Sequence, residues 1–321
     1  MIDLTQEEIT RNWGVDDSDN PLVSIKCMTY NHENYIAQCI DGFLMQKTNF
    51  PFEILIHDDC STDKTESIVR EYEKRFPKII KGLYETENQW QKGCGAHHTK
   101  IDAAIKGKYI ALCEGDDYWI DENKLQMQVD FLENNPEYTM CFHNAIEHYE
   151  DGSVSDKQFS QVENRDYSGI EFFKHWIVPT ASVIYKKEIT ESDFYKKIKE
   201  DRNLIFGDTP LFLTSTKYGR VRGFSNTMVV YRRQINGASY GINLKRDYLQ
   251  YFHNKTLGKY FPKIKKYVKI NNMKLLGSRC AYCLLNKNAL GMDFFKLNPI
   301  ICIILTPLYL LKFLKNPEYM H

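Results

Sequence analysis

Three clusters of polar side chains stand where apolar runs of the sequence end. They are Thr29-Tyr30-Asn31, Asp58-Asp59 and Glu114-Gly115-Asp116-Asp117. Carboxylates gathered in one place repel one another, so such clusters are tolerated where a cation sits among them or where they cap helices. Hard oxygen ligands suit Mg²⁺ or Mn²⁺, and these ions commonly bridge to the phosphates of a substrate. The clusters therefore predict a divalent cation that holds a phosphorylated substrate.

The sequence lacks the two common glycine-rich phosphate cradles. There is no GxxxxGK[ST] motif, and no GxGxxG follows a predicted strand. Phosphates must then be held by a metal ion and side chains. This pattern favours a nucleotide-diphosphate donor whose leaving group is neutralised by the ion.

The elements that must position these clusters alternate between strand and helix. Apolar and β-branched runs predict strands at 22–28, 52–59, 79–85 and 108–113, and helical spacing predicts helices at 35–45, 60–76, 100–106 and 121–136. Alternation at this short period is typical of βαβ units and a largely parallel sheet. Ligands of such sheets bind beyond the carboxyl ends of the strands, which is where the three clusters fall.

Composition narrows the class of protein. The 321 residues contain 42 Lys+Arg and 42 Asp+Glu, and this zero net charge argues against a nucleic-acid partner. Nine scattered cysteines favour reduced thiols in the cytoplasm over a disulfide framework. Residues 1–20 have no apolar core typical of a secretory signal, and we expect them to form a loose leader.

The C-terminal quarter combines basic and apolar character. No Asp or Glu occurs from Tyr248 to Met292, a stretch with nine Lys or Arg, and residues 294–315 are then almost wholly apolar. One interpretation is a helical subdomain with a solvated basic face and one buried helix. The other is peripheral contact with the inner face of the plasma membrane through residues 255–315. Both remain open from the sequence.

Three segments in order carry a family resemblance. PLVSIKCMTYNHENYI, EILIHDDCSTDKT and GKYIALCEGDDYW together resemble family 2 glycosyltransferases of GT-A fold, and the likeness covers roughly residues 21–240. The resemblance implies an α/β fold: a GT-A type, Rossmann-like mixed sheet flanked by helices, with a helical C-terminal extension. The expected divisions are a leader at 1–20, the GT-A domain at 21–240 and a basic helical region at 241–321.

The resemblance also implies an activity. A sugar, hexosyl or N-acetylhexosaminyl, would pass from a nucleotide-diphosphate sugar, with UDP as the expected nucleotide, to an acceptor hydroxyl with inversion and with help from Mn²⁺ or Mg²⁺. The acceptor would be a glycan or a lipid-linked sugar in surface polysaccharide synthesis. Two alternatives stay open: a sugar-nucleotide pyrophosphorylase, although TYNHENY stands where its glycine-rich loop would be, and an inactive protein that only binds nucleotide-sugars.

By the same resemblance, the donor site draws on the three clusters. Asp117 would ligate the metal and Asp116 would contact the ribose or a metal-bound group. Thr29, Tyr30 and Asp59 would contact the nucleobase. The alternative for the aspartates is a role at helix starts, where carboxylates are common.

The remaining predicted site residues lie later in the chain. Asp208 matches the context of the family's catalytic base, and it is equally well placed to cap a helix that begins near Pro210. Arg233 or its neighbour Arg232 could hold the diphosphate, or both could be solvated. Gln234 stands where many members have a metal-binding His.

A second departure lies at 98–99, where the family often has Arg-Asn and this chain has His-Thr. The first departure, at Gln234, replaces an expected metal ligand. The second, at 98–99, removes an arginine whose positive charge would face the diphosphate.

Overall fold

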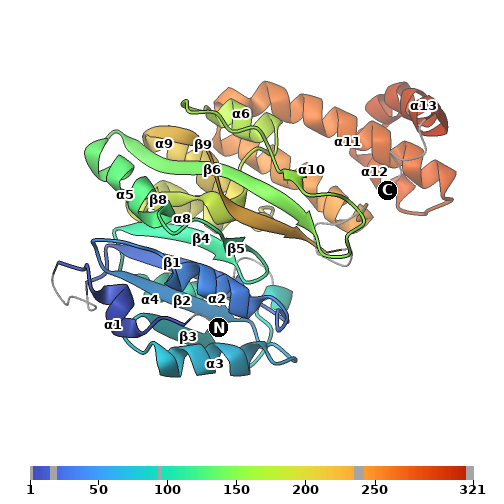
Figure 1. Ribbon diagram of the computed structural model, residues 1–321. Coiled ribbons are helices and arrows are strands. Elements are labelled where there is room, and N and C mark those ends of the chain that lie inside the picture. The colour runs from blue at the N-terminus through green and yellow to red at the C-terminus, as the bar shows by residue number, and fades with distance from the viewer. Residues whose placement is uncertain (1–2, 15–19, 93–95, 235–241, 316–321) are drawn as a thin grey trace. The chain divides into compact units, whose positions relative to one another are not determined.

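The chain forms two compact units in a computed structural model that describes residues 3–14, 20–92, 96–234 and 242–315 (Figure 1). The first unit comprises Met1–Lys197 with Leu211–Ile235, and the second comprises Ile198–Pro210 with Asn236–His321. The first contains the sheet and the second is helical. Residues 198–210, which the sequence places in the GT-A domain, therefore group with the C-terminal helices.

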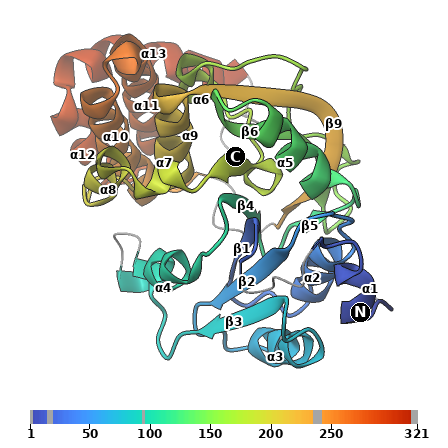
Figure 2. The same ribbon diagram turned by 90° about the vertical axis from the view of Figure 1, so that its left-hand side faces the viewer.

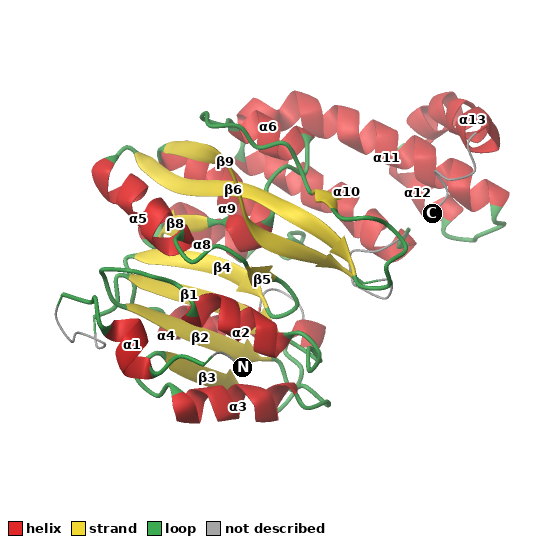
Figure 3. Cartoon of the chain, viewed as in Figure 1, coloured by secondary structure: helices red, strands yellow, loops and turns green. Residues whose placement is uncertain are grey.

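One mixed sheet organises the first unit (Figure 3). Its strands are β1 (Val23–Thr29), β2 (Phe52–Asp58), β3 (Ile80–Tyr84), β4 (Tyr109–Glu114), β5 (Tyr118–Trp119), β6 (Tyr138–Tyr149), β7 (Lys157–Gln158), β8 (Ile184–Lys186) and β9 (Arg220–Arg233). Their order is β3-β2-β1-β4-β8-β6-β9-β5, with β7 added to β6. The four predicted strands are confirmed within one or two residues at each end, because each is a short apolar run between turn-rich segments.

The directions of the strands bring six carboxyl ends to one edge of the sheet. Strands β1, β2, β3 and β4 are mutually parallel, β8 is antiparallel to both β4 and β6, and β9 is parallel to β6. It follows that β1, β2, β3, β4, β6 and β9 all end on the same side. Their register is level there, since Thr29 pairs with Asp58 and Met28 pairs with Glu114.

Helices cover both faces of the sheet. Those of the first unit are α1 (Gln6–Thr10), α2 (Ile36–Leu44), α3 (Thr65–Arg75), α4 (Ala96–Ala104), α5 (Lys124–Asn134), α6 (Gly169–Lys174) and α7 (Glu188–Glu191), whereas α8 (Asp193–Lys199) and α9 (Asp208–Tyr218) run across the division between the units. Figure 2 shows α2 and α3 on one face of the parallel strands and α4 on the other. Alternate residues of β1 and β2, such as Ile25 and Ile54, pack in the core under α2 and α3, while Leu55 packs with Ile101 of α4.

The N-terminal segment is more ordered than the loose leader expected from sequence. Thr5 and Glu8 form a reciprocal capping box at the start of α1. Ile9 and Trp13 are buried in the core, and the Trp13 indole donates to Thr48 Oγ1 at 3.1 Å. Residues 1–2 and 15–19 of the predicted leader lie outside the described residues.

The second unit consists of packed helices. They are α10 (Leu244–Tyr260), α11 (Lys265–Leu285), α12 (Gly291–Leu297) and α13 (Pro299–Lys315), with a 3₁₀ turn, η3, at Pro262–Ile264. A small core joins α11, α12 and α13 through Leu276, Cys280, Phe294 and Cys302. None of the helices within the described ranges is long and apolar enough to cross a membrane.

Candidate active site

The turn after β4 carries Asp116 and Asp117 and folds tightly against the end of β1. The Asp117 N–H donates to the Glu114 carbonyl at 3.0 Å, and the Gly115 N–H donates to the Met28 carbonyl at 2.8 Å. A Cβ on Gly115 would lie 2.7 Å from Thr29 Oγ1, so only glycine allows this approach. The turn thereby holds both aspartates at the edge where the parallel strands end.

Asp117 is the most unusual carboxylate of this edge. The side chain is buried, and its Oδ1 accepts a hydrogen bond of 2.9 Å from the Arg232 backbone N–H. Its Oδ2 is buried as well and has no hydrogen-bond partner among the residues that the structure describes. A buried carboxylate oxygen is normally paired, so this atom indicates a ligand that would complete it.

The charges around Asp117 support that inference. Burial raises the pKa of the Asp117 carboxyl well above its usual range, and the negative charges of Asp116 and Glu114 raise it further. The hydrogen bond from Arg232 acts in the opposite direction. A cation beside Asp117 would remove the repulsion among the three acids and favour the ionised form.

The Asp116 side chain is more exposed than that of Asp117, and its carboxylate interacts with two neighbouring side chains. Its Oδ2 accepts from Gln234 Nε2 at 3.2 Å and lies 3.9 Å from His32 Nε2. The other His32 ring nitrogen lies 3.2 Å from Thr29 Oγ1. The structure thus brings together Thr29 and Asp116, two residues that the sequence predicts for the donor site, and Gln234, which stands at the position of the family's metal-binding His.

Arg232 ties the last long strand to this turn. Its guanidinium donates to the Asp116 carbonyl at 2.6 Å and to the Gln38 side chain, pairs with Glu150, and lies over the Tyr118 ring. β5 pairs with β9, with Tyr118 opposite Val230, and this register sets Arg232 against the aspartates. From the sequence, Arg232 is either a diphosphate contact or a solvated residue. The β5–β9 pairing that places it beside the turn has no local signal in the sequence.

Asp59 lies in a contrasting environment after β2. Its carboxylate is buried, and its two oxygens accept backbone hydrogen bonds from Gln89 at 2.7 Å and Trp90 at 2.9 Å. These bonds hold the start of the 3₁₀ turn η1 (Trp90–Lys92). The preceding Asp58 accepts from the backbone and the hydroxyl of Ser61, as expected for a turn residue.

Two further nucleobase candidates follow β1. Thr29 is buried, and its carbonyl accepts the Asp59 N–H at 3.0 Å, so the ends of β1 and β2 are locked together. The Tyr30 side chain is 40% exposed, which leaves its ring open to a flat partner. Asn31 takes a left-handed conformation with φ of 54°, and its side-chain oxygen accepts from the Thr62 N–H at 2.8 Å.

Arg233 is engaged away from the aspartates. Its guanidinium pairs with the buried Glu147 of β6, which also pairs with Lys157 at 3.3 Å. Residues 235–239, which follow Gln234, lie outside the described residues.

Asp208 begins α9 and belongs to the second compact unit. One of its oxygens accepts the N–H of the next residue, Thr209, at 2.7 Å. Burial raises the pKa of its carboxyl.

The donor set around Asp117 fits a hard divalent cation. The part of the chain that the structure describes contains no group of three or more His, Cys, Asp or Glu arranged to hold a metal ion. Mg²⁺ and Mn²⁺ are often bound by only one or two carboxylates, with water and substrate phosphates as the other ligands. Asp117, with Asp116 beside it, suits this kind of site, in which the nucleotide brings part of the coordination shell.

The chain is similar to several known sequences. The model of glycosyl transferase family 2 matches residues 24–194. An uncharacterized protein of Mycobacterium tuberculosis is 37% identical over 216 residues, which are 67% of this chain and 60% of that protein. The putative teichuronic acid biosynthesis glycosyltransferase TuaG of Bacillus subtilis is 30% identical over 171 residues, 53% of this chain and 64% of TuaG. The chain thus spans less than two thirds of these relatives.

Solved structures share the fold. S. aureus TarS in complex with UDP-GlcNAc aligns with a TM-score of 0.54 at 17% identity, over 74% of this chain and 66% of that one. The mannosyltransferase PcManGT of Pyrobaculum calidifontis, in complex with GDP-Man and Mn²⁺, aligns with a TM-score of 0.53 at 17% identity, over 97% and 88%. The mixed sheet flanked by helices is of GT-A type. With a family model that matches more than half of its length, the chain belongs to glycosyltransferase family 2.

Proposed function

We propose that the chain transfers a sugar from a nucleoside-diphosphate sugar, with UDP as the nucleotide, to an acceptor hydroxyl with inversion and with the help of Mn²⁺ or Mg²⁺. The observation that carries this proposal is the buried Asp117 at the ligand-binding edge of the sheet, whose Oδ2 has no partner within the described chain. The names of TuaG and of the Escherichia coli glucosyltransferase WfgD, 36% identical over 118 residues, favour a role in polysaccharide synthesis.

The donor would lie across the ends of β1, β2 and β4. Asp117 would hold the ion, with Asp116 next to it, and the exposed ring of Tyr30 would stack on the base. Thr29 and Asp59 would border the same nucleoside. When bound, the ion stabilises the negative charge that develops on the departing diphosphate.

In the proposed chemistry, Asp208 acts as the general base. The acceptor oxygen forms a bond to the anomeric carbon while the bond from that carbon to the diphosphate oxygen breaks, and the acceptor proton passes to the Asp208 carboxylate. The raised pKa of Asp208 suits a group that must gain a proton during the reaction. A single in-line displacement inverts the anomeric centre and requires no covalent intermediate.

The acceptor is proposed to be a glycan or a lipid-linked sugar. WfgD is named for transfer to a sugar on diphosphoundecaprenol, and an acceptor of this kind would bring the chain to the inner face of the plasma membrane. Hexosyl and N-acetylhexosaminyl donors both fall within the proposal.

A donor screen tests the reaction. UDP-, GDP- and dTDP-sugars are incubated with the protein with and without Mn²⁺, and the released nucleoside diphosphate is measured. We expect release from UDP-sugars that depends on the metal. Binding of UDP-sugars with no release from any donor and acceptor would show a binding protein instead, and metal-independent release would contradict the role of Asp117.

The base has a matched control. Asp208 and Asp193 are each the first residue of a helix, but Asp193 is exposed. Asp208→Asn should retain donor binding and lose about 10²–10⁴-fold in transfer, the usual contribution of a general base. Asp193→Asn should transfer at the wild-type rate. Full activity of Asp208→Asn would leave Asp208 with a structural role only.

A further inference from the structure

The last helix, α13, is apolar on every side. Its 17 residues contain no acid, and its two basic residues, Lys312 and Lys315, lie in the last turn. One side is buried at Cys302 and Phe313, and Cys302 belongs to the helical core. A soluble helix normally turns a polar face to water, so an apolar outer face needs an explanation.

The outer side of α13 exposes a continuous row of large apolar side chains. Its members are between 58% and 69% exposed: Ile300, Ile303, Ile304, Leu308, Leu311 and Leu314. At 100° per residue, these positions fall on one face of the helix. Single exposed leucines are ordinary, but a face of six marks a surface that docks on something apolar.

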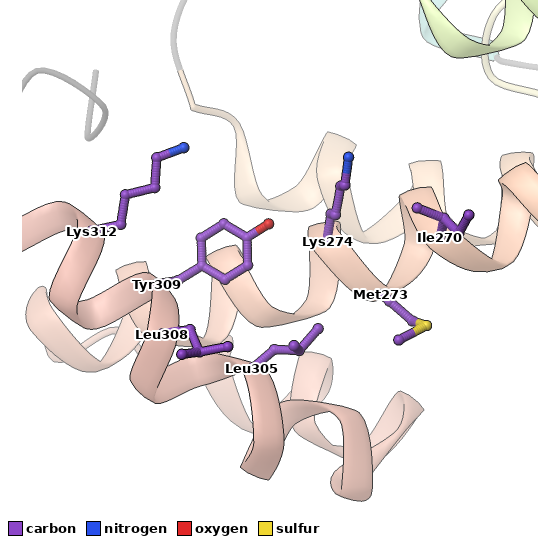
Figure 4. Close-up of a pocket in the computed structure, with 7 residues that line it drawn as sticks. All are labelled: Ile270, Met273, Lys274, Leu305, Leu308, Tyr309 and Lys312. Atoms are coloured by element: carbon purple, nitrogen blue, oxygen red, sulfur yellow. The ribbon is translucent and has the colours of Figure 1, made fainter.

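A groove between α11 and α13 adjoins this face. It has a volume of about 430 Å³ and is lined by Ile270, Met273, Lys274, Leu305, Leu308, Tyr309 and Lys312. Figure 4 shows the Lys274 and Lys312 side chains reaching to the same side of the two helices, with Leu305, Leu308 and Met273 on the other. Apolar walls beside two amines match an amphiphile with a hydrocarbon chain and an anionic headgroup.

The positive charge of residues 248–292 indicates what binds to the apolar face and groove. From Tyr248 to Met292 there are nine Lys or Arg and no acid. Lysines next to an apolar helix face are the combination that binds anionic lipid headgroups while the apolar side chains enter the interface. A second copy of the chain would fit less well, since neither α13 nor residues 248–292 contain an acid that could pair with Lys274 and Lys312 of the other copy.

We infer that the exposed face of α13, together with the α11–α13 groove, docks on an anionic lipid bilayer. The helix lies along the membrane surface and does not cross it, because 17 residues fall short of the roughly 20 that a span requires. Pro307 is exposed on the same face and faces the lipid with its neighbours. This inference goes beyond the proposed transfer reaction and does not depend on its substrates.

Vesicle sedimentation of the full chain tests the inference. We expect binding to phosphatidylcholine vesicles that contain phosphatidylglycerol, weaker binding to phosphatidylcholine alone, and a decrease with added salt. The triple variant Ile303→Ser, Leu308→Ser, Leu311→Ser should bind at least about tenfold more weakly. Val154→Ser, which changes an exposed apolar residue of the first unit, should bind as the wild type does.

A second variant keeps the test independent of folding. Lys274→Gln with Lys312→Gln leaves the apolar face intact and should lose up to about thirtyfold in affinity for the anionic vesicles only. The inference is overturned if the wild type binds neither vesicle, or if the triple serine variant binds both as the wild type does. It is also overturned if the wild type is a dimer that the triple variant dissociates, without any vesicle binding. Donor hydrolysis without vesicles stays unchanged in all these variants, so a failure of the proposed reaction is seen separately.

Discussion

Paired acids lie where β2 and β4 end, at the same edge of the sheet, but the two pairs use their carboxylates differently. The two oxygens of Asp59 accept hydrogen bonds from the backbone N–H groups of Gln89 and Trp90. One oxygen of Asp117 accepts a hydrogen bond from the Arg232 backbone N–H, and the other has no hydrogen-bond partner within the described chain. A buried carboxylate whose two oxygens both accept hydrogen bonds from the backbone stabilises the fold. A buried carboxylate with one oxygen that accepts no hydrogen bond, and with a raised pKa, is suited to bind a ligand.

The largest effect should come from Asp117. Asp117→Asn keeps the shape and an oxygen for the Arg232 N–H but removes the charge that would hold a cation. We expect transfer to fall by on the order of 10²–10³-fold, similar to the loss of one strong transition-state contact. Thermal unfolding of the ligand-free protein should be unchanged or shifted upward, because a strained buried charge is gone.

The opposite pattern, normal transfer with a large loss of stability, would show that Asp117 is structural. The two turns would then be equivalent, and the contrast between them would have no functional meaning.

The pH dependence of the free energy of unfolding provides a second test of the difference between Asp117 and Asp59. The pKa of Asp117 is higher in the folded than in the unfolded protein, so the folded state binds this proton more tightly. The stability that it contributes is complete below the unfolded pKa of about 3.9 and is lost as pH rises through the folded pKa. Relative to wild type, Asp117→Asn should therefore gain stability as pH increases over this window, which urea unfolding at several pH values would measure. If the free energies of unfolding of the wild type and Asp117→Asn change with pH in parallel, the raised pKa of Asp117 is contradicted.

Asp59 should behave as a scaffold residue. Asp59→Ala removes the acceptors of two backbone N–H groups and should lower the free energy of unfolding by about 1–3 kcal/mol. Asp59→Asn retains one oxygen and should lose less. Urea unfolding and UDP binding are measured on both variants. Unchanged stability with lost UDP binding would instead assign Asp59 to the nucleobase alone.

The smallest effect is expected at Gln234. Its side chain donates to Asp116 at 3.2 Å, so Gln234→Ala should weaken Mn²⁺-dependent UDP binding by up to about tenfold. Gln234→His places an imidazole there and should restore or raise the affinity. Complete loss of metal dependence in Gln234→Ala would make Gln234 a direct ligand and would shift the centre of the site away from Asp117.

Much of the first unit was predictable because its signals are local. Short apolar runs ending in Thr29, Asp58 and Glu114 predict parallel strands whose carboxyl ends meet. The bonds of Asp59 were not predictable, since they depend on how the loop before η1 returns to the sheet. Nor was the contact between Arg232 and the Asp116 carbonyl, which joins residues 116 apart in the sequence and depends on the pairing of β5 with β9.

The N-terminal segment shows the same limit. Its short helix has a local signal in Thr5 and Glu8, a capping box. The burial of Trp13 depends on a partner 35 residues away, Thr48, and this partner cannot be read from the segment itself.

Calorimetric titration of UDP with and without Mn²⁺ probes the unpaired oxygen of Asp117 most directly. For the wild type we predict that Mn²⁺ strengthens UDP binding by at least about tenfold, and that Asp117→Ala abolishes this gain while Asp193→Ala preserves it. A variant lacking Asp117 that still shows the full Mn²⁺-dependent gain would contradict the proposed metal site.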